Sequence, residues 1–93
     1  MKDKKDLRIV FMGTPEFAVA QLDELIKRGY DIAAVVTVPD KPAGRGKKLT
    51  PSAVKTYASE HCLDVLQPEK LRDDAFLKRL GEINADIFVI IVE

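Results

Sequence analysis

The sequence is poor in the features that would assign it to a specialised class of protein. It contains a single cysteine, Cys62, which excludes a disulfide within the chain and is typical of a reducing compartment such as the cytoplasm. Lys and Arg together number 15, as do Asp and Glu, so the formal net charge is zero. The chain as a whole therefore lacks the excess of cations that marks DNA-binding proteins, and any basic surface has to be local.

Long apolar segments are also missing. The longest apolar run, IFVIIV at 87–92, is far too short to cross a bilayer, which takes about 20 residues. The first six residues, MKDKKD, are charged, and no apolar core of a signal peptide follows them. We therefore expect a cytoplasmic protein that has no membrane partner.

What the sequence does contain is an alternation of short apolar runs with amphipathic segments. Apolar residues make up 46% and charged residues 32%, which is typical of a soluble globular protein. We predict strands at 7–13, 31–38, 64–68 and 85–92, and helices that start at Thr14-Pro15, at Thr50-Pro51 and at Asp73 or Asp74. This order predicts an α/β fold of about four strands and three helices, in which helices cover both faces of a parallel sheet.

The helical segments show the apolar spacing expected of surface helices. In the first, apolar residues recur at helical spacing from Phe17 to Ile26, and Gly29 is expected to end the helix. In the third, we expect Phe76, Leu77 and Leu80 to share one buried face.

The order of the strands predicts where a site would lie. If the first three strands run outward and the fourth returns beside the first, the strand order reverses between strands one and four, and ligands bind at such a point. The chain ends at Glu93, at the tip of the fourth strand. We therefore expect residues 1–93 to be part of a longer domain, with a complete small domain as the alternative.

The connection VPDKPAGRGKKL at 38–49 is the most unusual segment. It spans roughly a dozen residues where about 2–6 usually suffice, and such excess is often functional. Lys41, Arg45, Lys47 and Lys48 supply four cations against the single anion Asp40. Arginine can form two parallel hydrogen bonds to a phosphate, and Gly44 and Gly46 would let the backbone approach it closely. Besides a solvated basic loop, the pattern therefore favours a contact with a nucleic-acid backbone.

Three other candidate sites have simpler explanations than dinucleotide binding, metal binding or catalysis. Gly13-Thr14-Pro15 keeps only the first glycine of a dinucleotide-binding G-x-G-x-x-G pattern, so the turn more simply lines a pocket for another ligand. His61 and Cys62 lack further metal ligands, and we expect a histidine near a helix end and a small core cysteine. Glu69, Asp73 and Asp74 flank a helix start, where capping and solvation explain them. We predict no metal site.

Three stretches together resemble the N-terminal part of the methionyl-tRNA formyltransferase family. They are RIVFMGTPEFA at 8–18, VPDKPAGRGKKLTPSAVK at 38–55 and LQPEKLRD at 66–73, so the resemblance covers nearly the whole chain after its charged leader. GTPEFA is shared with related formyltransferases. PDKPAGRGKKL is more specific, because folate-dependent relatives that act on small amines usually lack it.

The resemblance implies a Rossmann-like domain whose enzyme moves a formyl group from 10-formyltetrahydrofolate to the amino group of methionine on initiator tRNA. It implies that the basic loop contacts the tRNA acceptor end, chiefly through Arg45, with Lys41, Lys47, Lys48, Gly44 and Gly46 in support. It also implies that Gly13, Thr14, Pro15 and Phe17 help to shape the active-site cleft.

The same resemblance places the chemistry outside the chain. The family's catalytic Asn, His and Asp and its folate-binding stretch lie further along than residue 93, so no catalytic residue is assigned here, and His61 does not match the catalytic histidine. Val92 and Glu93 depart from the family, which usually has an Ala and then an aromatic residue there. We expect a monomeric full-length enzyme and a shorter chain that can self-associate. A small RNA-binding module without catalysis and a fragment of a sugar-amine formyltransferase are the alternatives.

Overall fold

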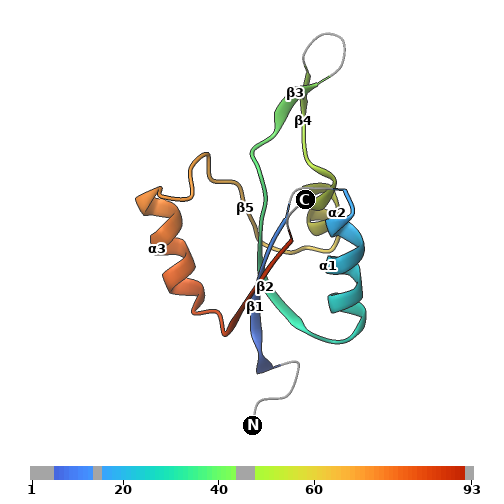
Figure 1. Cartoon of the computed structure of the whole chain (residues 1–93), viewed down its shortest axis with the longest axis vertical. Coiled ribbons are helices and arrows are strands. Elements are labelled where there is room, and N and C mark those ends of the chain that lie inside the picture. Colours follow the sequence, from blue (N-terminus) through green and yellow to red (C-terminus); the bar gives the residue numbers. More distant parts are fainter. Residues whose placement is uncertain (1–5, 14–15, 44–47, 92–93) are drawn as a thin grey trace.

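The structure is a computed structural model, and it describes residues 6–13, 16–43 and 48–91. Its elements follow the predicted alternation of strands and helices, with one addition between the second strand and the second helix (Figure 1). In chain order they are β1 (Arg8–Met12), α1 (Ala18–Lys27), β2 (Asp31–Val36), β3 (Lys41–Ala43), β4 (Lys48–Thr50), α2 (Ala53–Glu60), β5 (Val65–Leu66), α3 (Asp74–Ile83) and β6 (Ile87–Ile90).

Four of the strands form one parallel sheet in the order β5-β2-β1-β6. In chain order, β1, β2 and β5 therefore follow one another outward across the sheet, and β6 returns to the other side of β1. Ile9 of β1 pairs with Ile32 of β2 and with Ile87 of β6, which places β1 in the middle. The predicted Rossmann-like topology is confirmed, and the strand order reverses between β1 and β6.

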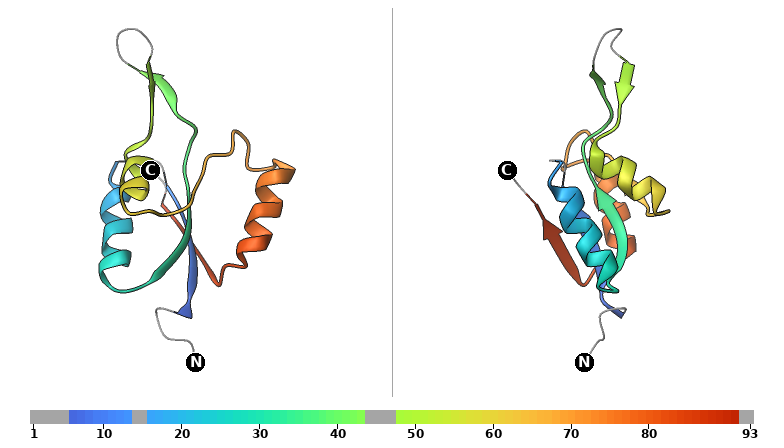
Figure 2. Two further views of the ribbon diagram at one scale, coloured as in Figure 1. Left: turned by 180° about the vertical axis from the view of Figure 1, so that it is seen from behind. Right: turned by 90° about the vertical axis from the view of Figure 1, so that its right-hand side faces the viewer.

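Helices cover both faces of this sheet, as the alternation predicts (Figure 2). On one face, Ile9 and Phe11 of β1 pack in a buried cluster with residues of α1 and α2, including Leu22 and Val54. On the other face, Val10 packs with residues of β2 and α3. Because successive side chains of a strand point to opposite faces, an uninterrupted apolar run such as residues 9–12 of β1 fits only between two covering layers.

Two helices begin later than predicted. A side chain caps α2 at Ser52, whose Oγ accepts a hydrogen bond of 3.1 Å from the Lys55 amide, so this helix starts after Thr50-Pro51. The first helix starts at Ala18 because a turn precedes it, in which the Val19 amide donates to the Glu16 carbonyl. Thr14 and Pro15 lie outside the described residues.

The third helix begins as predicted. The Asp73 carboxylate accepts hydrogen bonds from the Ala75 and Phe76 amides at 2.8 and 3.1 Å, which confirms the capping interpretation. Its buried face, however, consists of Phe76 and Ile83 with Leu80 half-buried, while Leu77 is 50% exposed. The prediction that Leu77 lies on that face was wrong. Residues three or four apart share one face of a helix, whereas Leu77 directly follows Phe76 and points in another direction.

The ends of α1 and α2 share one geometry. In each, a residue with positive φ follows the helix, Gly29 at 87° and Cys62 at 57°, and the next amide returns to a carbonyl in the last turn. The prediction that Gly29 ends α1 is confirmed. The prediction of a buried Cys62 is wrong, because this terminating position projects the cysteine into solvent, where it is exposed.

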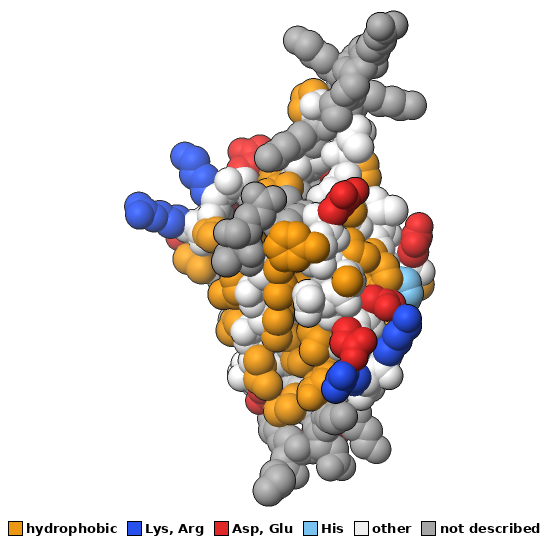
Figure 3. Space-filling model, turned by 45° about the vertical axis from the view of Figure 1, so that its right-hand side comes forward, with side chains coloured by type: hydrophobic (Ala, Val, Ile, Leu, Met, Phe, Trp, Pro, Cys, Tyr) orange, Lys and Arg blue, Asp and Glu red, His pale blue; other side chains and the backbone are white. Residues whose placement is uncertain are grey.

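The outer strands are shorter and more exposed than expected. The strand predicted at 64–68 is only Val65–Leu66, and β6 leaves Ile87, Phe88 and Ile90 exposed at 39%, 48% and 61%. Figure 3 shows hydrophobic side chains gathered in the middle of one face of the molecule. Within the described ranges, β6 pairs with β1 alone. No helix in the described part of the chain is long and apolar enough to span a membrane.

Candidate functional site

The described parts of the predicted basic loop form the two short strands of a β-hairpin. Strands β3 and β4 pair antiparallel, with Lys41 opposite Thr50, Pro42 opposite Leu49 and Ala43 opposite Lys48. The hairpin projects beyond the carboxyl end of β2 and away from the sheet (Figure 1). These two strands were not among the four predicted ones, and their cross-strand pairing satisfies backbone groups that an unpaired loop would leave to solvent.

Two of the four predicted cations lie in the described strands of this hairpin. Lys41 opens β3 and Lys48 opens β4. Gly44, Arg45, Gly46 and Lys47, which connect the two strands, lie outside the described residues. The hairpin nevertheless brings Lys41 and Lys48 onto neighbouring strands of one small unit.

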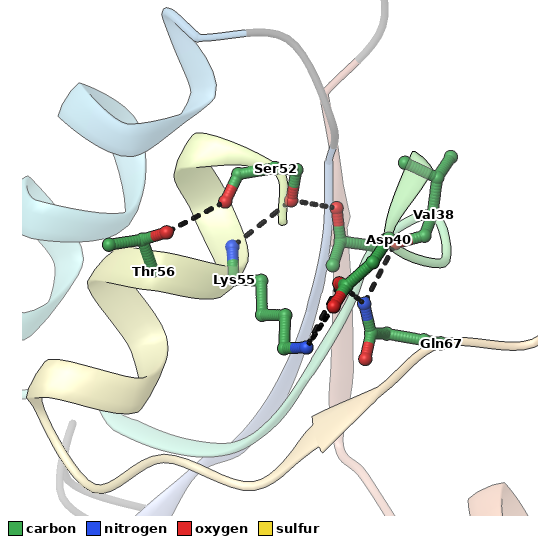
Figure 4. A network of polar contacts seen from close by, with 7 residues as sticks. Val38, Asp40, Ser52, Lys55, Thr56 and Gln67 are labelled. Carbon is green, nitrogen blue, oxygen red and sulfur yellow. Dashed lines mark hydrogen bonds and ion pairs between the residues drawn. The ribbon is translucent and has the colours of Figure 1, made fainter. Parts of the chain in front are cut away.

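Polar contacts fasten the base of the hairpin to the sheet and to α2 (Figure 4). We call Thr37, Asp40, Ser52, Lys55 and Gln67 the hairpin neck. The hydroxyl oxygens of Thr37 and Ser52 lie 2.9 Å apart, and Lys55 Nζ donates to both carboxylate oxygens of Asp40 at 2.9 Å. Gln67 Nε2 donates to Asp40 Oδ1 at 2.8 Å and to the carbonyl of Val38 at 3.1 Å. The neck thus joins the chain before β3, the first turn of α2 and the connection after β5.

Hydrogen bonds from Lys55 and Gln67 lower the pKa of Asp40 below its usual value. The carboxylate therefore stays ionised at neutral pH, and its charge is balanced by Lys55. From the sequence, Asp40 was only the lone anion of the basic segment, and Lys55 and Gln67 had no predicted role. An acid flanked by prolines and cations needs a partner, and here the partners come from 15 and 27 residues away.

Of the other predicted site residues, Gly13 and Phe17 are described and follow the carboxyl end of β1, whereas Thr14 and Pro15 lie outside the described residues. The Gly13 amide donates to the Val36 carbonyl at 3.0 Å, and a Cβ at Gly13 would lie 3.0 Å from Cβ of Ala18. A side chain at Gly13 would therefore crowd Ala18 at the start of α1, so the backbone approaches the helix closely here. Phe17 precedes α1 and is 52% exposed, although its spacing had placed it on the apolar face.

These two groups of residues share one end of the parallel sheet. Gly13 follows β1 beside β6, at the point where the strand order reverses, and the hairpin leaves the carboxyl end of β2. Ligands of such sheets bind at this end. Gly13 and the described strands of the hairpin therefore lie on the side of the fold where a site is expected.

The remaining candidates, His61 and Cys62, lie at the end of α2. The His61 ring stacks on Tyr57 with centroids 4.0 Å apart, and His61 Nδ1 lies 2.9 Å from the Tyr57 carbonyl oxygen. Among the residues that the structure describes, no group of three His, Cys, Asp or Glu side chains could hold a metal ion.

Comparison with known proteins gives consistent matches. The family model described as "Formyl transferase" matches residues 7–92. The chain is 54% identical over 88 residues to a methionyl-tRNA formyltransferase of Bacteroides thetaiotaomicron, covering 95% of this chain and 27% of the relative. It is 55% identical over 89 residues to one of Parabacteroides distasonis (95% and 28%) and 51% identical over 85 residues to one of Geobacter metallireducens (91% and 27%).

The chain thus spans little more than a quarter of the length of the curated relatives that it matches. The matched region includes β1 with Gly13, the hairpin and its neck, and the strands that create the switch point. From the match over residues 7–92, this chain belongs to the formyl transferase family.

Proposed function

We propose that residues 1–93 form the N-terminal part of the catalytic domain of a methionyl-tRNA formyltransferase. In the full-length enzyme, this domain and a smaller C-terminal domain transfer the formyl group of 10-formyltetrahydrofolate to the amino group of methionyl initiator tRNA. The enzyme acts in the cytoplasm as a monomer. The relatives named above support this assignment through identities above 50%.

The observation that carries the proposal is the projecting hairpin. A segment with four cations in eight residues leaves the sheet at its ligand-binding end, and its base is fastened by the neck. Phosphate oxygens are the natural partners of such a segment, and backbone contacts fix the register of a nucleic acid without reading its sequence. No aromatic residue stands between 38 and 49, so stacking on bases is not part of the proposed contact.

The reaction needs groups that carry out the chemistry and groups that hold the substrates. The neutral amine of the aminoacyl group attacks the formyl carbon, a new C–N bond forms, and the bond from carbon to the folate nitrogen breaks. A base takes the proton from the attacking amine, and hydrogen-bond donors stabilise the oxyanion. We assign none of these roles to a residue of this chain. Arg45 and the neighbouring cations hold the acceptor end, while Gly13, Thr14, Pro15 and Phe17 line the cleft.

The test is the affinity of methionyl initiator tRNA for the full-length protein, measured from low to high salt. Arg45→Ala should weaken binding, and the loss should shrink as salt rises, because each phosphate contact releases counterions. The slope of log K against log salt should fall by about one. Lys78→Ala, a matched loss of one exposed cation on α3, should change neither quantity.

An unchanged affinity and slope for Arg45→Ala would overturn the role of the hairpin. RNA binding without formyl transfer by the full-length protein would favour the non-catalytic binding module. Transfer of the formyl group to an amino sugar but not to methionyl-tRNA would favour the sugar-amine enzyme.

A further inference from the structure

The β3–β4 hairpin is too small to set its own position. It contains three residue pairs and forms a separate two-stranded sheet, within the described ranges, that shares no strand with the main one. A two-stranded hairpin of this size is marginally stable by itself in water. The direction in which it projects therefore depends on the contacts at its two ends.

The neck joins both ends of the hairpin. On the entering side lie Thr37 and Asp40, and on the leaving side lie Ser52 and Lys55. Each residue of one side contacts a residue of the other, through the 2.9 Å contact between hydroxyls and the two-oxygen ion pair. The two strands thus enter and leave the body of the protein at a fixed separation.

Gln67 adds a third point of attachment. Its amide donates to Asp40 Oδ1 and to the Val38 carbonyl, so the entering strand is also held to the connection after β5. Two cross-links between the same two strands would still permit rotation about the line that joins them. A third contact from another element removes that freedom.

We propose that Asp40, Lys55 and Gln67 are positioning residues for substrate binding: they hold the hairpin at the angle at which its cations meet the tRNA, and Lys55 is not itself a phosphate contact. This inference rests on the proposed function of the hairpin. The side chains of Lys55 and Asp40 are 28% and 27% exposed, so they attract each other more strongly than a fully exposed pair. Loss of either partner leaves the other half-buried without its counter-ion.

Asp40→Asn separates positioning from simple charge. The substitution removes an anion from a cationic segment and releases Lys55, so charge effects would make RNA binding tighter. Positioning predicts the opposite. If the hairpin keeps the competent orientation in only about a tenth of the molecules, the apparent dissociation constant rises about tenfold.

The experiment uses the full-length protein with two readouts. One is the KM for methionyl initiator tRNA beside the KM for the formyl donor. The other is hydrogen exchange of the backbone amides in 41–50, measured by mass spectrometry without RNA. Asp40→Asn and Lys55→Met should raise the KM for tRNA about tenfold, leave the KM for the donor unchanged, and accelerate exchange in the hairpin.

Matched variants complete the design. Lys55→Arg retains a cation that can donate to both oxygens of Asp40 and should restore both readouts to near the parent values. Lys78→Met removes one exposed cation elsewhere and should leave both unchanged. Tighter tRNA binding by Asp40→Asn, or unaltered hairpin exchange, would overturn the inference.

Arg45→Ala tests whether the hairpin binds tRNA separately from whether Asp40 helps to position the hairpin. If Arg45→Ala raises the KM for tRNA and Asp40→Asn does not, the hairpin binds tRNA and the positioning role is wrong. If neither does, the proposed function of the hairpin has failed, and the positioning role fails with it.

Discussion

The Tyr57 hydroxyl donates a hydrogen bond of 2.6 Å to Oδ1 of Asp23, which joins α2 to α1 on one face of the sheet. The other oxygen of Asp23 accepts from Lys27 Nζ at 2.8 Å. These two helices cover the same face of the sheet, and α2 begins shortly after the hairpin. The bond between Tyr57 and Asp23 therefore holds α1 to α2, the helix whose first turn contacts the base of the hairpin through Lys55.

Because of the environment of Tyr57, the stability of the fold should fall at alkaline pH. Burial, the hydrogen bond to Asp23 and the charge of Asp23 raise the pKa of Tyr57 from 10.0 to about 12. A phenol whose pKa is raised on folding contributes stability that is complete below pH 10 and is lost as the pH rises from 10 to about 12. In Tyr57→Phe this part of the alkaline loss should disappear, as measured by urea unfolding across that pH range. The tyrosinate absorbance step near pH 12 should vanish as well. Its persistence in the variant would show that the assignment to Tyr57 is wrong.

Gly13 and Gly81 give a matched pair of substitutions. Gly13→Ala should destabilise the chain by about 1–3 kcal/mol, because the new Cβ would lie 3.0 Å from Cβ of Ala18 and 3.2 Å from Cε1 of Phe11. Gly81 lies inside α3 with nothing within 4 Å of the added atom, so Gly81→Ala should stabilise by roughly 0.5–1 kcal/mol. The midpoints of urea unfolding should move in opposite directions. Equal shifts would contradict the close packing at Gly13.

Substitutions at Asp73 and Asp74 should show that a side-chain cap stabilises α3 more than an interaction with the helix dipole does. Asp73→Ala should cost about 1 kcal/mol, because two amides at the start of α3 lose their acceptor. Asp74 lies in the first turn and interacts favourably with the helix dipole, so Asp74→Ala should cost only about 0.3–1 kcal/mol. Thermal unfolding of the two variants provides the comparison. A larger loss for Asp74→Ala would refute the assignment of Asp73 as the cap.

The exposed strand β6 predicts self-association of the 93-residue chain. Ile87, Phe88 and Ile90 are exposed, and an apolar edge strand readily pairs with another chain. Sedimentation velocity should show species larger than the monomer as concentration rises. Ile90→Lys should reduce them, whereas Leu71→Lys, which alters an equally exposed leucine outside β6, should not. A monomer at every concentration would contradict this expectation.

Much of the fold could be predicted because its signals are local or follow from topology. The apolar run at 7–13 predicted the strand β1, and the alternation of elements predicted both covering layers. Helix boundaries were less accurate. Ser52 and Thr50 are both good capping residues, and only the packed structure shows that Ser52 accepts the hydrogen bond. Cys62 looked like a core residue because nothing in the sequence marks its positive φ.

The candidate site could be located from the sequence but not assembled from it. The cluster of cations in 41–48 identified the hairpin as basic. Its strand pairing was missed because three residue pairs that include a proline carry little strand signal. The partnership of Asp40 with Lys55 and Gln67 depends on contacts between distant segments, which no spacing rule reveals.

Formyl transfer by the full-length protein is the most direct test of the central claim. Purified protein is mixed with 10-formyltetrahydrofolate and methionyl initiator tRNA, and the formylated aminoacyl group is quantified after release from the tRNA. We expect rapid formylation by the full-length protein, a reduced kcat/KM for Arg45→Ala, and no transfer by the 93-residue chain. Formylation by the 93-residue chain itself, or none by the full-length protein, would contradict the central claim.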